Sequence, residues 1–319
     1  MTGRAEARGW EWVEPWLRLK YRKQHKTRAN SLNWWSWLFA FLEERGIAGP
    51  RALDRTGAMD YIEWRMGQVK RSGKKPGYNS ALQELKMLGR VMREAIHRGL
   101  ATSNPCERLG LEKEKAPEKP EMTDAEIAQI RSKLAGIEGH LPLTERWMSV
   151  SFEIALHQGC REQETQIPID RIDWAAGTIR FHAKRAEVYT VPIHPGLRPL
   201  LEQLRGAGAR TTCTLPPMAS RHWTRFFKGR AERSEPAFLG HLCFHCSRVT
   251  VVTRLARAGV PLQQAMAYVH HANELIHRVY QRLRPADVTG CHAALAFPES
   301  ATGSDGGLAG RSDAGQAIP

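Results

Sequence analysis

The sequence predicts a mainly α-helical protein of two domains, a helical bundle followed by a mixed α/β domain that contains a small antiparallel β-sheet. Three features predict this fold. Apolar residues recur at helical spacing through the N-terminal third, a charged connector with two prolines follows, and short runs rich in β-branched and aromatic residues come later. A chain of 319 residues with 42% hydrophobic residues is long enough to bury two ordinary cores.

The first domain is predicted to be a helical bundle over residues 28–110. Apolar side chains share one helical face over residues 31–44, and similar patterns run over residues 61–69 and 79–97. Each pattern ends close to a glycine, a frequent signal for the end of a helix. Helices of this length are stable mainly through packing of their apolar faces, which favours a bundle.

A charged segment over residues 111–121 has no apolar periodicity and is predicted to be an exposed linker. The second domain is predicted to span residues 122–298. It begins with a helix, because Thr123 and Glu126 have the spacing of a capping box. Residues 299–319 are rich in Gly, Ser and Ala, and are predicted to be a disordered tail.

The small sheet is predicted from three short β-rich runs, of which the last two alternate apolar and polar residues. These runs are residues 167–174, 178–183 and 188–193. Helical patterns return after residue 219, with breaks at Gly240, at residues 259–261 and near Pro285. The last helix is predicted over residues 273–283, with its apolar side chains packed against the domain. These side chains are Leu275, Val279 and Leu283.

The charge balance indicates a polyanionic partner. Lys and Arg outnumber Asp and Glu by 47 to 33, which gives a net charge of +14 and a pI near 9.8. Nucleic acid is the first expectation, because phosphate neutralisation releases condensed counterions, and an anionic membrane surface is the second. The sequence has no apolar run of membrane-spanning length and opens without an apolar signal core, so we expect a cytoplasmic protein without membrane attachment, whose six cysteines are reduced.

Residues 1–27 are predicted to be a basic N-terminal arm. Basic residues crowd the stretch from Arg18 to Arg28, directly after three tryptophans. This pattern is typical of an arm that faces DNA, and also of a solvated helix face.

Cleavage of a DNA phosphodiester without a metal needs cations for the phosphate oxygens, an acid for the leaving oxygen and a nucleophile. Arg161 could clamp a phosphate and be oriented by Glu164, which lies three residues later and shares one face if the helix continues. Lys184 lies at a predicted strand turn, where an ammonium could protonate a leaving oxygen. Taken alone, each feature is more often an ordinary surface residue.

The next candidates lie closer to the C-terminus. His245 and Arg248 are three residues apart, so a helix would present both toward one phosphate. His271 precedes Tyr280 by nine residues. A tyrosine needs nearby cations and a proton acceptor to act as a nucleophile, and the other candidates would supply both. An isolated tyrosine in such a stretch is usually a core or interface residue.

The order Arg, Lys, His-x-x-Arg, His, Tyr resembles the signature of the tyrosine recombinase, or phage integrase, family. The segment Gly-Cys-Arg161-Glu-Gln-Glu164 is similar to the first-arginine motif of that family, and His245-Cys-Ser-Arg248 is similar to its His-x-x-Arg box. His271 and the tyrosine nine residues later resemble its last box and its nucleophile. The resemblance covers roughly residues 28–285, including a helical core-binding first domain of the SAM-like type.

The resemblance implies a site-specific recombinase whose nucleophile is Tyr280, which would form a 3′-phosphotyrosyl link and free a 5′-hydroxyl. Both arginines and His271 would bind the phosphate oxygens, Lys184 would be the general acid, and His245 would assist proton transfer at the tyrosine. No cofactor or metal is implied. Two departures stand out: His270 replaces a usual glycine and is a candidate supporting residue beside Glu164, and His277 replaces a common small hydroxyl residue.

The resemblance also implies the partners. The first partner is double-stranded DNA with specific core sites. The protein would form a homotetramer on paired sites and would be a monomer or weak dimer when free. An accessory DNA-bending or directionality factor is a possible further partner. The expected biological role is integration or excision of a mobile element, and the protein would be associated with the nucleoid. Alternatives are a resolvase of the Xer type, a type IB topoisomerase, a DNA-binding regulator on the same scaffold that does not cut, and a zinc module. The zinc module would use His241, Cys243, His245 and Cys246.

Overall fold

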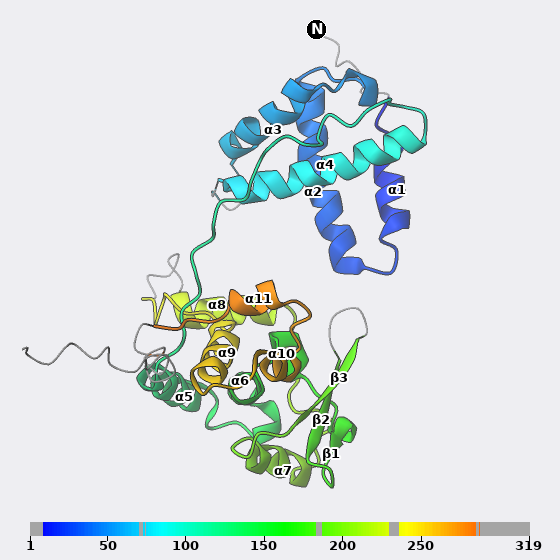
Figure 1. The fold of residues 1–319 in the computed structure, drawn as a ribbon. Coiled ribbons are helices and arrows are strands. Elements are labelled where there is room, and N and C mark those ends of the chain that lie inside the picture. Colours follow the sequence, from blue (N-terminus) through cyan, green and yellow to red (C-terminus); the bar gives the residue numbers. More distant parts are fainter. Residues whose placement is uncertain are drawn as a thin grey trace, which may run out of the picture. The chain divides into compact units, whose positions relative to one another are not determined.

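The computed structural model describes residues 9–69, 73, 75–182, 187–229, 236–284 and 287. The chain divides into two compact units, Met1–Pro117 (unit 1) and Glu118–Pro319 (unit 2), each with its own hydrophobic core (Figure 1). The division falls within the charged segment over residues 111–121. The predicted fold class, mainly helical with a small antiparallel sheet, is confirmed. No helix within these ranges has the length and apolar character needed to cross a membrane.

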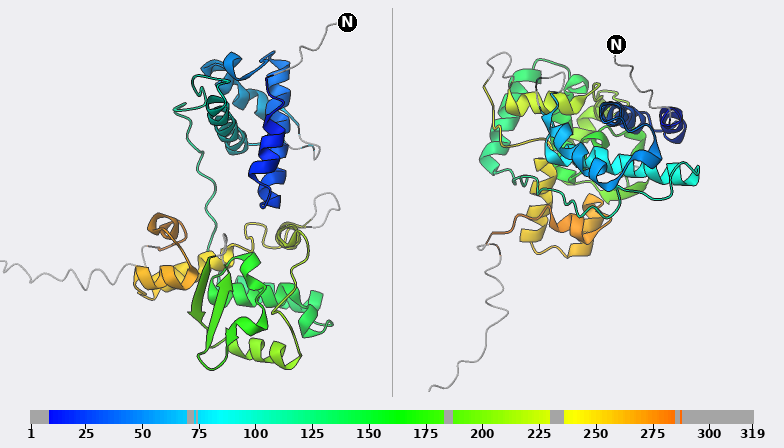
Figure 2. Two further views of the ribbon diagram at one scale, coloured as in Figure 1. Left: turned by 90° about the vertical axis from the view of Figure 1, so that its right-hand side faces the viewer. Right: turned by 90° about the horizontal axis from the view of Figure 1, so that it is seen from above.

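Unit 1 is a helical bundle in which α4 packs against α2 and α3, and α1 packs against α2 (Figures 1 and 2). Its helices are α1 (Val13–Lys20), α2 (His25–Glu44), the short 3₁₀ helix η1 (Pro50–Ala52), α3 (Arg55–Gly67) and α4 (Tyr78–His97). The apolar face of α4 is fully buried, so most of the stability of this helix comes from packing rather than from helix propensity.

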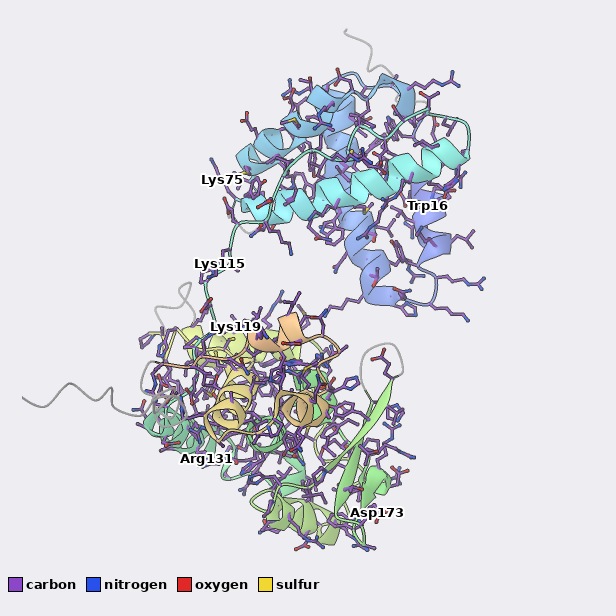
Figure 3. All side chains as sticks on the ribbon, in the orientation of Figure 1. Trp16, Lys75, Lys115, Lys119, Arg131 and Asp173 are labelled. Carbon is purple, nitrogen blue, oxygen red and sulfur yellow. The ribbon has the colours of Figure 1, made fainter. Side chains whose placement is uncertain are left out.

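The structure corrects the prediction of a separate arm over residues 1–27 for the part that it describes, residues 9–27. Trp10, Val13 and Leu17 are all at most 1% exposed and belong to the core of unit 1. Val13 and Leu17 lie on one face of α1, and Trp10, just before the helix, belongs to the same core, so α1 packs into the bundle. The basic side chains that follow lie at the surface around the α1–α2 turn, and the Lys20 ammonium lies 4.5 Å from the ring centre of Trp16 (Figure 3). The alternative of a solvated helix face describes them better.

A buried ion pair connects α3 to α4 inside unit 1. Arg65 Nε donates to Glu84 Oε2 at 2.7 Å, and the hydroxyl of Tyr61 donates to the same oxygen at 2.6 Å. The Arg65 and Glu84 side chains are 1% and 4% exposed, and the guanidinium stacks over the ring of Trp37. Removing one charge of such a pair leaves the other without compensation in a medium of low dielectric constant.

We predict that Glu84→Gln lowers the free energy of unfolding of unit 1 by about 3 kcal/mol, because Arg65 stays buried without a counter-charge. Urea unfolding followed by tryptophan fluorescence measures this, since seven of the ten tryptophans precede residue 65. The control is Glu94→Gln, whose partner Arg98 is 39% exposed, and it should cost less than about 1 kcal/mol. Equal losses in the two variants would contradict the prediction.

Unit 2 combines helices with one three-stranded sheet, which lies at one side of the unit (Figures 1 and 2). Its helices are α5 (Asp124–Glu138), η2 (Leu143–Glu145), α6 (Trp147–Gln158), η3 (Glu162–Thr165), η4 (Ile169–Arg171), α7 (Arg198–Gly206), α8 (Ala219–Lys228), α9 (Cys246–Arg257), α10 (Leu262–Val269) and α11 (Glu274–Arg278). The strands are β1 (Ile172–Asp173), β2 (Thr178–His182) and β3 (Val188–Pro192). They are antiparallel in the order β1-β2-β3, with Phe181 opposite Tyr189.

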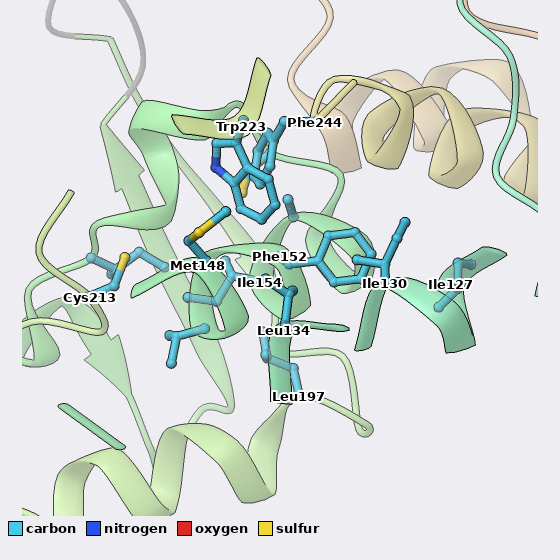
Figure 4. Close-up of a cluster of buried hydrophobic side chains, with 14 of the residues drawn as sticks. Ile127, Ile130, Leu134, Met148, Phe152, Ile154, Leu197, Cys213, Trp223 and Phe244 are labelled. Atoms are coloured by element: carbon cyan, nitrogen blue, oxygen red, sulfur yellow. The ribbon is translucent and has the colours of Figure 1, made fainter. Parts of the chain in front are cut away.

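The core of unit 2 surrounds α6, which packs between α5 and α9. Phe152 and Ile154 of α6 are fully buried, close to Ile130 of α5 and Trp223 of α8 (Figure 4). The predicted capping box starts α5: Thr123 Oγ1 accepts from the backbone N–H of Glu126, and the Glu126 carboxylate accepts from the backbone N–H of Thr123. This rigid frame supports the loops at the ends of α6, α9 and α10.

The prediction of a long packed helix over residues 273–283 was wrong. Helix α11 ends at Arg278, and Leu275, Val279 and Leu283 are 72%, 65% and 43% exposed. No part of unit 2 described by the structure opposes that apolar face, so its periodicity does not lead to packing. The segment is fixed instead by the fully buried His277 and by backbone bonds to Thr253 of α9.

Candidate active site

Arg161 lies directly after a tight turn at the end of α6. Gly159 ends the helix with a positive φ of 62°, and a Cβ there would come within 2.8 Å of Val269 Cγ1. Arg161 then precedes the 3₁₀ turn η3, so the α-helix does not continue through this segment. Its Nη1 donates to Glu164 Oε1 at 2.8 Å, and its backbone N–H donates to Glu164 Oε2 at 2.6 Å. The carboxylate is buried and holds a half-exposed guanidinium in place.

A second layer supports Glu164 from the sheet. The hydroxyl of Tyr189 donates to Glu164 Oε2 at 3.3 Å, and the ring of His270 stacks on the Tyr189 ring with 4.3 Å between centroids. His270 Nε2 lies 3.3 Å from Glu187 Oε2. His270 has a left-handed backbone conformation with φ of 52°, which is costly for a residue with a side chain. The stacking and the contact with Glu187 compensate where the integrase resemblance expects glycine.

Arg248 is a buried cation in the first turn of α9. It is 1% exposed, its Nη1 donates to the carbonyl of Gly159 at 2.7 Å, and its Nε donates to His271 Nε2 at 3.1 Å. Burial lowers its pKa, and the neighbouring Arg161 lowers that pKa further. Its Nη2 has no hydrogen-bond partner among the described residues. An unpaired donor on a buried cation favours a site for an anion.

The contact with Arg248 fixes the proton positions on two histidines. A guanidinium can only donate, so His271 Nε2 accepts and His271 Nδ1 carries the hydrogen. His271 Nδ1 lies 3.0 Å from His277 Nδ1, which must therefore accept. Burial, together with the nearby Arg248 and His277, lowers the pKa of His271 to about 3. Burial also lowers the pKa of His277, so both rings are neutral near pH 7.

His245 and Tyr280 are in direct contact. His245 Nε2 lies 3.0 Å from the Tyr280 hydroxyl. Burial, together with the nearby Lys119 and Arg248, lowers the pKa of His245 to about 4. A neutral imidazole can accept the phenolic proton. The backbone of Tyr280 is held as well, because its carbonyl accepts from Thr253 Oγ1 at 3.1 Å.

Five of the six predicted catalytic residues thus meet in one place at the ends of α6, α9 and α10. Arg161 lowers the pKa of both His245 and His271, the rings of His271 and Tyr280 are 4.7 Å apart, and Arg248 Cζ lies 6.0 Å from the centre of the Tyr280 ring. The five are Arg161, His245, Arg248, His271 and Tyr280. The sixth, Lys184, lies outside the described residues.

A family model described as the phage integrase family matches residues 121–286, just over half of the chain. The chain belongs to the phage integrase family. The resemblance seen in the sequence is therefore confirmed, and with it the enzyme class of tyrosine site-specific recombinases. None of the curated proteins compared with this integrase family member matches it.

Solved structures of integrases share the fold of this family member. The Tn1549 transposon integrase (residues 82–397, with circular intermediate DNA) superposes with a TM-score of 0.58 and 16% identity, over 89% of this chain and 99% of that chain. A lambda integrase dimer (residues 75–356, bound to a core site) superposes with a TM-score of 0.58 and 16% identity, over 86% of this chain and 95% of that chain. The XerH recombinase bound to a palindromic difH substrate superposes with a TM-score of 0.52 and 14% identity, over 80% of this chain and 75% of that chain.

The sequence did not reveal three residues of the site. Tyr189 belongs to an alternating strand and gives no sign that its hydroxyl reaches Glu164. His277 stood out as a departure from the integrase pattern, without an indication that it binds His271. Lys119 lies in the charged linker segment, where one lysine among several carries no signal.

The structure does not assemble the zinc module. His241 Nε2 binds Glu126 Oε1 at 2.7 Å, and His245 is occupied by Tyr280. Within the ranges that the structure describes, no three His, Cys, Asp or Glu side chains are placed to hold a metal ion.

The depressed histidine pKa values predict acid sensitivity of unit 2. His245 and His271 bind a proton near pH 6.5 when unfolded, but only near pH 4 and pH 3 when folded. Because the unfolded chain binds more protons, the free energy of unfolding falls as the pH drops below about 6.5, by at most about 1.4 kcal/mol per pH unit for each group. We expect thermal melts without DNA to show a lower melting temperature at pH 5 than at pH 7.

His245→Gln should make the melting temperature of unit 2 less dependent on pH in that window, because one of the two groups is removed. His140→Gln replaces an exposed histidine of unit 2 and is the control, for which the pH dependence should stay as in the wild type. A pH dependence that is unchanged in His245→Gln would contradict the assignment.

Proposed function

We propose that this chain is a site-specific DNA recombinase that cuts and rejoins DNA strands through a 3′-phosphotyrosyl intermediate at Tyr280. The observation that carries the proposal is the 3.0 Å contact between His245 Nε2 and the Tyr280 hydroxyl, next to two arginines. A phenol is a weak nucleophile until a base accepts its proton. The lowered pKa of His245 keeps its imidazole neutral and able to do so.

In the proposed reaction, the Tyr280 oxygen attacks phosphorus while its proton passes to His245 Nε2. The bond from phosphorus to the 5′-oxygen breaks, and Lys184 supplies the proton that the leaving oxygen needs. A 5′-hydroxyl from a second strand then attacks the phosphotyrosine and releases the tyrosine. The number of phosphate ester bonds is unchanged throughout, so the chemistry requires no external energy source.

The phosphate oxygens are proposed to bind Arg161 and Arg248. The free Nη2 of Arg248 is a ready donor for one oxygen, and the mutual repulsion of the two guanidiniums is relieved when an anion lies between them. His271 would add a hydrogen bond to the phosphate once DNA replaces Arg248 as the partner of its Nε2 and its proton lies on Nε2 instead of Nδ1, with His277 Nδ1 then donating to His271 Nδ1. Glu164 would position Arg161 directly, and His270 would support Glu164 through the ring of Tyr189.

Both units are proposed to bind double-stranded DNA with specific core sites. The net charge of +14 and the exposed basic residues around the α1–α2 turn favour phosphate contacts. Unit 1 would be the core-binding domain and unit 2 the catalytic domain. The Tn1549 and lambda integrase structures both contain DNA, which supports this assignment.

We infer a role in the integration or excision of a mobile element, in the cytoplasm and on the nucleoid. The structural likeness to the Tn1549 transposon integrase, over 99% of that chain, supports a mobile element. A homotetramer on paired sites is the proposed working form, with a monomer or weak dimer in the absence of DNA. The likeness to XerH supports the second candidate, a resolvase.

A nicked suicide substrate that carries the junction sequence of the element tests the nucleophile. The wild type should give a protease-sensitive protein–DNA band on a denaturing gel. Tyr280→Phe should give none, because the phenolic oxygen that forms the bond is missing, while its affinity for the same DNA stays within about threefold because no phosphate donor is lost.

A covalent band with Tyr280→Phe would exclude Tyr280 as the nucleophile. Specific DNA binding without a band from either protein would instead favour a regulator that does not cut.

A further inference from the structure

Two cysteines flank the proposed base at the start of α9. Cys243 and Cys246 belong to the segment Cys-Phe-His-Cys, in which His245 directly precedes Cys246. Their Sγ atoms are 3.7 Å apart, and the turn is closed by a bond from the backbone N–H of Cys246 to the carbonyl of Cys243 at 2.9 Å. The backbone N–H of Cys243 also approaches Cys246 Sγ at 3.4 Å. The two thiols are thus already in contact without a bond.

The two thiols differ in the way that a reactive pair requires. Cys243 is half-buried. The hydrogen bond with the Cys246 thiol is the main reason why the pKa of Cys243 is lowered to about 6. Burial acts in the opposite direction, and the nearby Lys119 lowers this pKa as well. The pKa of Cys246 is raised, first by the same hydrogen bond and then by burial. Cys243 is therefore the thiolate and Cys246 the proton donor at neutral pH.

The other cysteines in the described part of the chain contrast with Cys243. Burial raises the pKa of the thiols of Cys106, Cys160 and Cys213, which makes them poor nucleophiles. Oxidation of the described cysteines should accordingly begin at Cys243.

We propose that Cys243 and Cys246 form a redox modification site, at which hydrogen peroxide produces a disulfide that stops DNA cleavage by displacing His245. The proposal rests on the proposed function of His245 as the base for Tyr280. A short Cys-x-x-Cys segment at a helix start suits reversible oxidation, because one thiol attacks and its neighbour resolves the product.

The chemistry balances with one peroxide. The Cys243 thiolate attacks one peroxide oxygen, the O–O bond breaks, and the sulfenic acid of Cys243 forms while hydroxide leaves and takes a proton to become water. The sulfur of Cys246 then attacks the Cys243 sulfur, the S–O bond breaks, and a second water leaves with the Cys246 proton. Two thiols and one peroxide give one disulfide and two waters, and an added dithiol reverses the oxidation.

The disulfide would act on catalysis through the residues between the two sulfurs. A covalent bond requires the sulfurs to approach from 3.7 Å to roughly 2 Å, and in the proposed switch the segment between them, which carries His245, takes up part of this movement. Phe244 is 6% exposed and packs on Trp223 with 4.7 Å between ring centroids, so it is held in place. The movement of the segment therefore falls on the positions beside Phe244, which include His245. A proton acceptor must be held within roughly 0.5 Å of its working position, so the contact with Tyr280 is lost.

The test uses the full chain with hydrogen peroxide and no DNA, followed by alkylation of free thiols and mass spectrometry. We expect a peptide that contains Cys243 and Cys246, lacks both alkyl groups and has lost the mass of two hydrogen atoms. The rate of covalent adduct formation on the suicide substrate should fall by about 100-fold, the size expected for loss of a general base. Treatment with dithiothreitol should restore the rate.

Matched variants separate this site from general oxidation. Cys243→Ser should cleave DNA as the reduced wild type does and should resist peroxide, and Cys246→Ser is the second variant that cannot form the disulfide. Cys106→Ser, in unit 1, should remain as sensitive as the wild type. The proposal is overturned if peroxide produces no disulfide between Cys243 and Cys246, or if the disulfide forms and the cleavage rate is unchanged.

The two proposals fail in different ways. If the reduced wild type forms no adduct with DNA, the proposed function fails. The disulfide map needs no DNA, so a missing disulfide in a wild type that cleaves overturns the redox site alone.

Discussion

The guanidinium of Arg248 is a positive charge held inside unit 2 at 1% exposure, and the surrounding structure is arranged to tolerate it. The carbonyl of Gly159 and the ring of His271 accept two of its hydrogen bonds, and Nη2 has no partner among the residues that the structure describes. The requirement for that carbonyl explains the glycine turn at the end of α6. The requirement for a ring acceptor sets the proton position on His271 and then on His277. A buried cation of this kind is costly until an anion arrives, which links the architecture of the site to the binding of a phosphate.

A second set of contacts aligns the more exposed partner cation. Arg161 is held by Glu164, which is held by Tyr189 of β3, on which His270 stacks. The small sheet therefore serves the site, because it carries the tyrosine that fixes the carboxylate. Two positive charges, with a neutral histidine against the phenol, provide the cations, the base and the nucleophile that in-line attack on a phosphodiester requires.

Local spacing in the sequence predicted which residues form the site. The contacts between residues that are far apart in the chain could not be predicted in this way. His245 and Arg248 are three residues apart, so their joint presentation by α9 followed from helix geometry alone. The reach of Tyr189 to Glu164 depends on strand register, and the pairing of His271 with His277 depends on the bend over residues 271–273 between α10 and α11. The arm prediction failed for a related reason: basic residues dominate the composition after Lys20, whereas three apolar residues at helical spacing determine where α1 packs.

In the proposed function, Arg248 is a buried charge that is retained to bind a DNA phosphate. Melting temperatures of the wild type and of Arg248→Met, with and without the core-site DNA, test it most directly. Without DNA the variant should melt no lower than the wild type, because an apolar side chain of similar volume removes the burial cost of the charge. DNA should raise the melting temperature of the wild type by more than that of the variant. A variant that melts several degrees lower without DNA and gains as much from DNA as the wild type would contradict the account.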